Sequence, residues 1–312
     1  MNKTALLFPG QGSHFVGMGR DLYNEYEVAK RVFEEANDVL GYDITKICFE
    51  GNLLKLNSLE NMFPGLFIVC VALFKVYMQE MGVSPQYSAG HSLGEYAALT
   101  CSGALEFADA LKMIYRRGVL AQEIADSGEG SMTIVEGIDI QTAEVECKKI
   151  SSPDQMVGVS CYNSPSQIAI SGHQDAVVQV EDNLIESGAQ ISPILTAPPL
   201  HCPLMQPVAD QLEIELKKYT YHELKWPVIS NVDALPYSNS NSILAKLKLQ
   251  LTHSVQWLAT IQYLEKQGIT NFIEIGPQSV LTSLLKTFVK NATMVSFGNK
   301  DDRQMLLKSL SS

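Results

Sequence analysis

Positive charge is scarce in this chain of 312 residues. Its 23 Lys and Arg side chains are outnumbered by 34 Asp and Glu, so the formal net charge is −11. A protein that binds a nucleic-acid backbone needs the opposite sign, because it must neutralise phosphates. The composition therefore disfavours a nucleic-acid partner. A hydrophobic share of 46% beside 18% charged residues is typical of a globular enzyme with a large core.

Long apolar runs are missing as well. The longest, Leu66 to Phe74, is about half the length that spans a bilayer. The apolar run 5–8 near the N-terminus is short and stops at Pro9-Gly10, which is unlike a signal peptide. We therefore expect neither a membrane segment nor a leader.

Paired cysteine motifs are absent too. None of the six cysteines forms a C-x-x-C pair, and most lie in apolar stretches. This pattern predicts buried free thiols, which fits a reducing cytoplasm. The cysteines are Cys48, Cys70, Cys101, Cys147, Cys161 and Cys202.

The most informative stretch is Gly90-His91-Ser92-Leu93-Gly94, which has the G-x-S-x-G pattern of a nucleophile elbow. A short strand-like run precedes it and a good helix opening follows it. We expect the two glycines to be required because a Cβ at either would collide with the sharply turned backbone. The start of the helix then offers the Leu93 N–H to an oxyanion. The alternative is an ordinary glycine-rich turn with a surface serine.

The order of predicted elements indicates an α/β fold. A strand at 3–8 ends in the glycine-rich loop 9–13, which is either a simple turn or a loop whose N–H groups face a ligand. Helices are predicted at 27–40, 64–81 and 106–125, with a loop from Gly41 to about Asn61. After 197 come a helix at 203–219, strands at 226–232, 271–275 and 293–297, and helices at 243–251, about 257–267 and 280–289.

The pattern of predicted elements changes after a glycine-rich hinge at 127–130. The segments 132–136, 141–150, 157–162, 167–171, 174–186 and 190–195 follow the order βαββαβ, which is the ferredoxin-like pattern. We therefore predict a small inserted domain at 128–196 and a large domain formed by 1–127 and 197–312.

A serine nucleophile needs a base, and His201 is the best candidate among six histidines. Two prolines precede His201 and fix its backbone, whereas His14 beside the glycine-rich loop is the second choice. His91 is expected to point to the other side of the turn. No acid stands in an obvious place, so we expect a backbone carbonyl to orient the histidine.

Arg117 lies near the edge of the apolar stripe of its helix, whereas Arg116 lies roughly opposite that stripe. Arg117 is therefore the better candidate for a charge that faces a pocket. A structural ion pair is the equally weighted alternative.

Several of these stretches together resemble the malonyl-CoA:acyl-carrier-protein transacylases of fatty-acid synthesis and the free-standing, trans-acting acyltransferases of polyketide synthases. The resemblance covers nearly the whole chain. It rests on the segments 8–13, 90–96, Arg116-Arg117-Gly118, 201–205, 255–257 and 274–277 in this order.

The resemblance implies an α/β-hydrolase-like large domain with the ferredoxin-like insert. It also implies that Ser92 is acylated from an acyl-CoA, that His201 is the base, and that the phosphopantetheine thiol of an acyl carrier protein takes the acyl group. Gln11 and Leu93 would supply the oxyanion N–H groups, and a carbonyl near Gln250 would orient His201. Arg117 would pair with the malonyl carboxylate, as guanidinium geometry favours. His91, Leu200 and Phe63 would complete the substrate site, with no metal or other cofactor.

Three positions depart from the family pattern. His14 replaces a usual Gln, Phe63 replaces a polar residue before the elbow, and Leu200 stands where Phe or Ser is common. The apolar Phe63 and Leu200 leave acyl selectivity open. They also keep a carrier-protein hydrolase on the same fold as the alternative function. A non-catalytic docking subunit is disfavoured by Ser92, His201 and Arg117, and a generic esterase by the absent acid.

Overall fold

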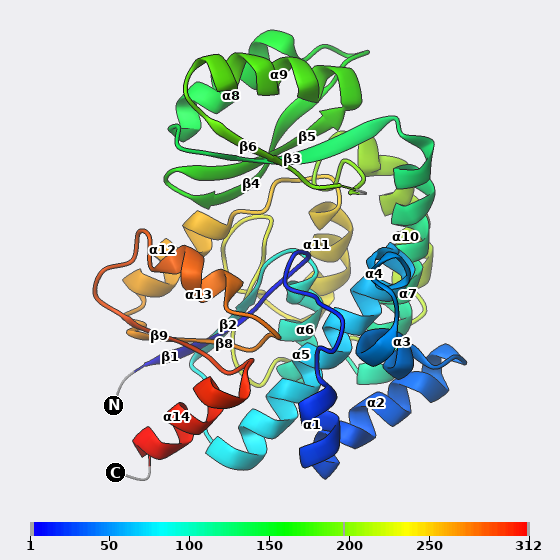
Figure 1. Cartoon of the computed structure of the whole chain (residues 1–312), viewed down its shortest axis with the longest axis vertical. Coiled ribbons are helices and arrows are strands. Elements are labelled where there is room, and N and C mark those ends of the chain that lie inside the picture. Colours follow the sequence, from blue (N-terminus) through cyan, green and yellow to red (C-terminus); the bar gives the residue numbers. More distant parts are fainter. Residues whose placement is uncertain (1–2, 196, 311–312) are drawn as a thin grey trace.

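The computed structural model describes residues 3–195 and 197–310. Its elements form a larger region around a parallel sheet and a smaller region around an antiparallel sheet, which lies at the top of Figure 1. The predicted domain limits at residues 1, 196 and 312 lie outside the described residues. The mixed α/β class is confirmed.

The elements preceding the smaller region run from β1 to α7. They are β1 (Thr4–Phe8), α1 (Arg20–Glu25), α2 (Glu27–Leu40), α3 (Ile44–Glu50), α4 (Leu53–Asn57), α5 (Leu59–Met81), β2 (Tyr87–Gly90), α6 (Gly94–Cys101) and α7 (Phe107–Ser127). The smaller region contains β3 (Gly130–Glu136), α8 (Ile140–Ile150), β4 (Val157–Ser164), β5 (Gln167–His173), α9 (Gln174–Glu186) and β6 (Gln190–Pro193).

The chain then returns to the larger region. There it forms a 3-10 turn (Pro203–Met205), α10 (Gln206–Leu216), β7 (Val228–Ile229), a second 3-10 turn (Ser240–Ser242), α11 (Ile243–Gln250), α12 (Trp257–Lys266), β8 (Asn271–Glu274), α13 (Val280–Leu285), β9 (Thr293–Ser296) and α14 (Lys300–Leu310).

The larger sheet has the strand order β7-β2-β1-β8-β9, and all its neighbours are parallel. Helices cover both faces, so its central strand β1 is buried at all five positions and reads as an apolar run. Phe8 pairs with Gly90, which places the loops after β1 and β2 at the same edge. The glycine-rich loop and the elbow therefore meet there.

Helix α5 passes through the core of the larger region. It is long and apolar enough to cross a membrane by composition, but 89% of its most apolar window is buried inside the protein. Pro64 lies within this helix and cannot donate to the Glu60 carbonyl. The Tyr42 hydroxyl donates to that carbonyl instead, at 3.5 Å.

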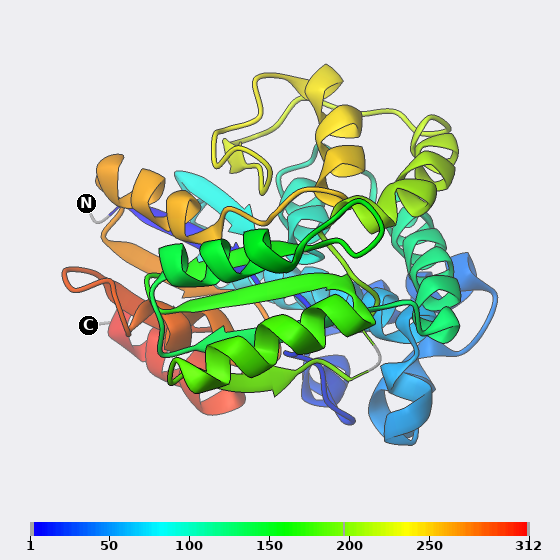
Figure 2. The ribbon, with the colours of Figure 1, turned by 90° about the horizontal axis from the view of Figure 1, so that it is seen from above.

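The smaller sheet is antiparallel, with the order β4-β5-β3-β6. Viewed from above, α8 and α9 lie across its outer face (Figure 2), where an apolar cluster of its own includes Val135, Ile170 and Val180. Met132 and Ala169 belong instead to the core cluster of the larger region. Side chains alternate between the two faces of a strand, so one face of the smaller sheet packs against α8 and α9 and the other packs against the larger region.

Several boundaries differ from the sequence prediction. The predicted loop at 41–61 is wrong, because it contains α3 and α4, each capped at its start by a side chain, and because α5 begins at Leu59. Helices α1 and α14 were not predicted. The predicted strand 226–232 shrinks to the two residues of β7, and the hinge at 127–130 reduces to Gly128 and Glu129 between α7 and β3.

Candidate active site

Ser92 occupies the sharp turn between β2 and α6. Its φ of 51° lies in the left-handed region, which is strained for a residue with a Cβ. A Cβ on Gly90 would lie 1.9 Å from the Gly94 carbonyl carbon, and one on Gly94 would lie 2.0 Å from the Phe8 oxygen. The predicted steric need for both glycines is therefore confirmed.

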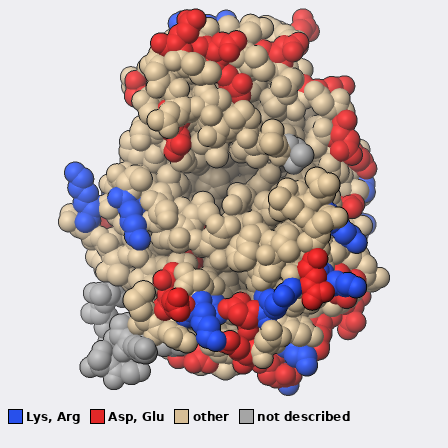
Figure 3. Space-filling view, in the orientation of Figure 1, with Lys and Arg blue, Asp and Glu red and all other residues tan. Residues whose placement is uncertain are grey.

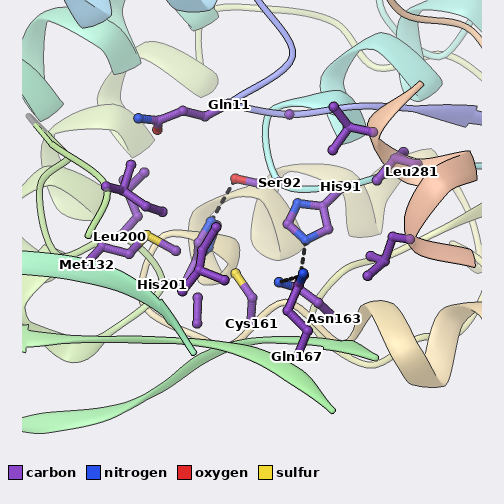
Figure 4. A pocket seen from close by; sticks show the side chains of 16 residues that line it. Gln11, His91, Ser92, Met132, Cys161, Asn163, Gln167, Leu200, His201 and Leu281 are labelled. Atoms are coloured by element: carbon purple, nitrogen blue, oxygen red, sulfur yellow. Dashed lines mark hydrogen bonds between the residues drawn. The ribbon is translucent and has the colours of Figure 1, made fainter. Parts of the chain in front are cut away.

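His201 faces Ser92 across the pocket. The two side chains are joined by a hydrogen bond of 2.7 Å between Ser92 Oγ and His201 Nε2, drawn in Figure 4. His201 also has a left-handed φ of 62°, and its backbone N–H donates to the Leu251 carbonyl. Two non-glycine residues in the left-handed region thus meet at one hydrogen bond, which is a hallmark of functional sites.

The second ring nitrogen of His201 fixes its tautomer. Nδ1 lies 2.7 Å from the backbone oxygen of Gln250, the last residue of α11. Because a carbonyl only accepts, Nδ1 must carry the proton, and Nε2 is left to accept from the serine hydroxyl. The predicted carbonyl contact is present.

Burial keeps this histidine uncharged. It lowers the pKa of His201 to about 3, with a further contribution from the Arg117 guanidinium, while the bond to Gln250 opposes the shift. A neutral imidazole is the form that takes a proton from serine, so His201 can act as a base at neutral pH.

Arg117 lies on α7 with no exposed surface. None of its three side-chain nitrogens has a hydrogen-bond partner among the described residues, and the Cζ atom is 5.5 Å from the ring centres of both Phe63 and Tyr96. Burial lowers the pKa of this guanidinium, whereas Tyr96 and Glu95 raise it. Among the described residues Arg117 forms no ion pair, which disfavours the ion-pair alternative; the Tyr96 side chain acts on the guanidinium but makes no hydrogen bond of standard geometry with it.

The pocket in front of Ser92 lies between the two regions, where Figure 3 shows a hollow with mostly uncharged surroundings. Of the predicted site residues, Gln11, His91 and Leu200 line it with Ser92 and His201. The other predicted residues lie outside the lining: Phe63 and Arg117, Leu93 at the start of α6, and Gln250 at the end of α11. The remaining lining is largely apolar, for example Met132, Ile194 and Leu281.

The expected direction of His91 is wrong. Its ring lines the pocket instead of pointing to the other side of the turn, and its Nε2 donates to Asn163 Oδ1 on β4 at 2.9 Å. Asn163 Nδ2 in turn donates to Gln167 at 3.1 Å (Figure 4). Burial lowers the pKa of His91. His14, the second choice for the base, is instead bonded to Asn57 at 3.0 Å.

A polar network behind the elbow was missed by sequence reasoning. Glu95 on α6 is fully buried and accepts from the Asn231 N–H at 3.0 Å, from the Tyr237 hydroxyl at 2.8 Å and from the Gln250 side-chain amide. Asn231 Oδ1 accepts from the Ser92 N–H at 2.7 Å. The position of Glu95 beside the elbow motif was a usable signal, whereas nothing local marks Asn231 or Tyr237.

Comparison with known proteins gives one consistent family. Residues 5–308 match the model of the acyl transferase domain. The chain is 40% identical to a malonyl CoA-acyl carrier protein transacylase of Bacillus subtilis, over 99% of this chain and 77% of that protein. It is 38% identical to the protein of that name from Escherichia coli K12, over 94% of this chain and 95% of the relative.

Solved structures of transacylases also superpose closely on this chain. The malonyl CoA-acyl carrier protein transacylase of Coxiella burnetii superposes with a TM-score of 0.95 at 35% identity, covering 100% of this chain and 98% of the other. A malonyl-transacylase solved in complex with its type II polyketide synthase acyl-carrier protein gives a TM-score of 0.94 at 34% identity, over 98% of this chain and 99% of that one.

Proposed function

The chain belongs to the acyl transferase family, among the malonyl-CoA:acyl-carrier-protein transacylases, and from this premise we propose that it moves a malonyl group from malonyl-CoA to the phosphopantetheine thiol of an acyl carrier protein. The reaction runs in two halves through an ester on Ser92. The observation that carries the proposal is the buried Arg117, which makes no hydrogen bond of standard geometry with the described residues and whose charge acts on His201 of the bonded Ser92–His201 pair.

In the first half, Ser92 Oγ attacks the thioester carbonyl while its proton moves to His201 Nε2, which lies 2.7 Å away. The resulting oxyanion is stabilised by the backbone N–H groups of Gln11 and Leu93, the latter at the positive end of α6. The C–S bond then breaks, and the coenzyme A sulfur leaves with the proton from His201.

In the second half, the carrier thiol gives its proton to His201 and its sulfur attacks the ester carbonyl. Breaking the C–O bond returns the proton to Ser92 and leaves the malonyl group on the carrier. The largely apolar pocket lining, with Leu200 beside His201, favours the pantetheine arm over water as the nucleophile.

Arg117 favours malonyl over acetyl as the acyl group. A guanidinium forms two parallel hydrogen bonds with a carboxylate, and an acetyl group has nothing to offer in that place. Since the three nitrogens of Arg117 make no hydrogen bond of standard geometry with the described residues, the free carboxylate of malonyl would supply two well-aligned acceptors.

We also propose a fold type for each of the two regions and a cellular location for the reaction. The strand order β6-β3-β5-β4 supports a ferredoxin-like domain at 128–196, and the elbow between β2 and α6 supports an α/β-hydrolase-like domain formed by 1–127 and 197–312. We place the reaction in the cytoplasm without a resident cofactor; the buried free cysteines support the location.

The test is incubation with malonyl-, methylmalonyl- and acetyl-CoA, read by intact mass with and without a phosphopantetheinylated carrier protein. We expect a malonyl mass on the enzyme that moves to the carrier, and no adduct on Ser92→Ala. Loss of the adduct to water in the presence of carrier would instead support the hydrolase alternative. Labelling of Ser92→Ala would overturn the serine mechanism.

A further inference from the structure

Glu95 is a buried carboxyl with a complete set of hydrogen-bond donors around it. Its Oε1 accepts from the Asn231 N–H and the Tyr237 hydroxyl, and its Oε2 accepts from the Gln250 amide. Three converging donors suit the ionised form, because a carboxylate accepts only.

Glu95 contacts both sides of the reacting pair through two amides. The Gln250 side chain also donates to the Ser92 carbonyl at 2.9 Å, while the Gln250 backbone oxygen holds His201. Asn231 accepts from the Ser92 N–H and donates to the Gly90 carbonyl at 2.6 Å. The turn that carries the serine and the carbonyl that orients the histidine therefore depend on one carboxylate.

A proton on Oε2 would face the Gln250 Nε2–H. The amide would then have to rotate and offer its Oε1, which has no partner in the present orientation. That rotation would remove the Nε2 donor from the Ser92 carbonyl. The two protonation states of Glu95 thus require two arrangements of Gln250.

We propose that Glu95 is a positioning residue that, as a carboxylate, holds Gln250 and Asn231 in the arrangement that aligns Ser92 with His201, and that its protonation releases this arrangement and slows Ser92. The inference rests on the proposed function only in taking Ser92 as the nucleophile. Glu95 would thus act on His201 indirectly, through Gln250, whose backbone oxygen holds the histidine where other serine enzymes use a carboxylate.

The groups that face Glu95 are Tyr237 after β7, Arg117 on α7 and its own neighbour Tyr96. Burial raises the pKa of Glu95 to about 7, against the lowering effects of the hydrogen bonds from Tyr237, Gln250 and Asn231 and of the Arg117 charge. Because burial lowers the pKa of His201 to about 3, we expect a loss of serine reactivity near pH 7 to follow Glu95 and not the base, and variants of Glu95 test this assignment.

The test measures the reactivity of Ser92 without an acyl substrate. Phenylmethanesulfonyl fluoride sulfonylates an activated serine, and intact mass gives the labelling rate of the folded protein between pH 5 and 9. For the wild type we expect the rate to fall on acidification with a midpoint near 7. Glu95→Gln should label at least roughly tenfold more slowly at pH 8 and show no such midpoint, because it resembles protonated Glu95 at every pH.

Two further variants distinguish a positioning role of Glu95 from a general loss of structure. Glu95→Asp retains the charge and should keep the acid midpoint with part of the rate. Glu274→Gln is the matched control, because Glu274 is also buried, accepts from the Leu281 and Thr282 N–H groups and has a pKa raised to about 7 by burial; its acid midpoint should remain.

Gln250→Ala covers the case in which Glu95→Gln does not fold. This variant keeps the backbone carbonyl for His201 but removes the amide that responds to Glu95, so the midpoint should flatten. A wild-type profile that is level from pH 5 to 8, or a midpoint that persists in Glu95→Gln, would overturn the inference. Failure of malonyl labelling with these pH effects intact would count against the proposed function alone.

Discussion

Arg117 offers the sharpest prediction about acyl selectivity. Replacing it by Met keeps a long apolar side chain on α7 and removes both the charge and the donors. We expect Arg117→Met to lose malonyl transfer while acetyl transfer is kept or improved. The guanidinium is fully buried and makes no hydrogen bond of standard geometry with the described residues, so the variant should unfold at a temperature no lower than the wild type.

The size of the loss follows from the geometry. A hydrogen bond to a charged group contributes about 1.5–3 kcal/mol, and a bidentate pair with malonyl would involve two of them. Their sum of roughly 3–6 kcal/mol corresponds to a fall of roughly 10²- to 10⁴-fold in kcat/KM, at about 1.4 kcal/mol for each tenfold. Arg117→Lys keeps the charge but not the fork, so its loss should lie nearer the lower value.

The assay compares initial rates of Ser92 acylation from malonyl-CoA and acetyl-CoA for the wild type and both variants. Arg116→Met is the control, because Arg116 is the neighbouring arginine and reaches outward to Gln211. A ratio of malonyl to acetyl rates that is the same in Arg117→Met and the wild type would refute the carboxylate role.

Three further predictions concern the elbow and the core. Gly94→Ala should abolish acylation or prevent folding, because its Cβ would lie 2.0 Å from the Phe8 oxygen; acylation and circular dichroism would show this, and an active folded variant would contradict it. Asn231→Ala leaves the Ser92 N–H and the Gly90 carbonyl unpaired, which should cost about 1–3 kcal/mol for each buried group, seen as a lower midpoint in urea. The pKa of Glu274 is raised to about 7 from an ordinary 4.5, so the unfolded chain releases this proton first and the wild type should lose stability relative to Glu274→Gln as pH rises from 4.5 to 7. Equal pH dependence of the two unfolding midpoints would contradict that sign.

Much of the fold could be predicted from local sequence patterns. The elbow was predictable because two glycines at fixed spacing, between a strand and a helix, satisfy a steric requirement that few other turns impose. The antiparallel insert was predictable from the order of its elements. Helices α3 and α4 were missed because each spans at most seven residues and depends on a single capping side chain, Asp43 or Asn52.

Spacing along the chain was enough to predict most of the longer helices and strands, the nucleophile turn and the choice of Arg117 over Arg116. Which distant residues come into contact depends on tertiary packing. Ser92 and Glu95 are three residues apart, but their partners come from distant segments of the chain. Asn231 follows β7 and bonds to the Ser92 and Glu95 side of the site, whereas Gln250 at the end of α11 bonds to Glu95 and to His201. The turn of His91 towards Asn163 likewise depends on how the smaller sheet closes over the pocket, and no local pattern encodes that contact.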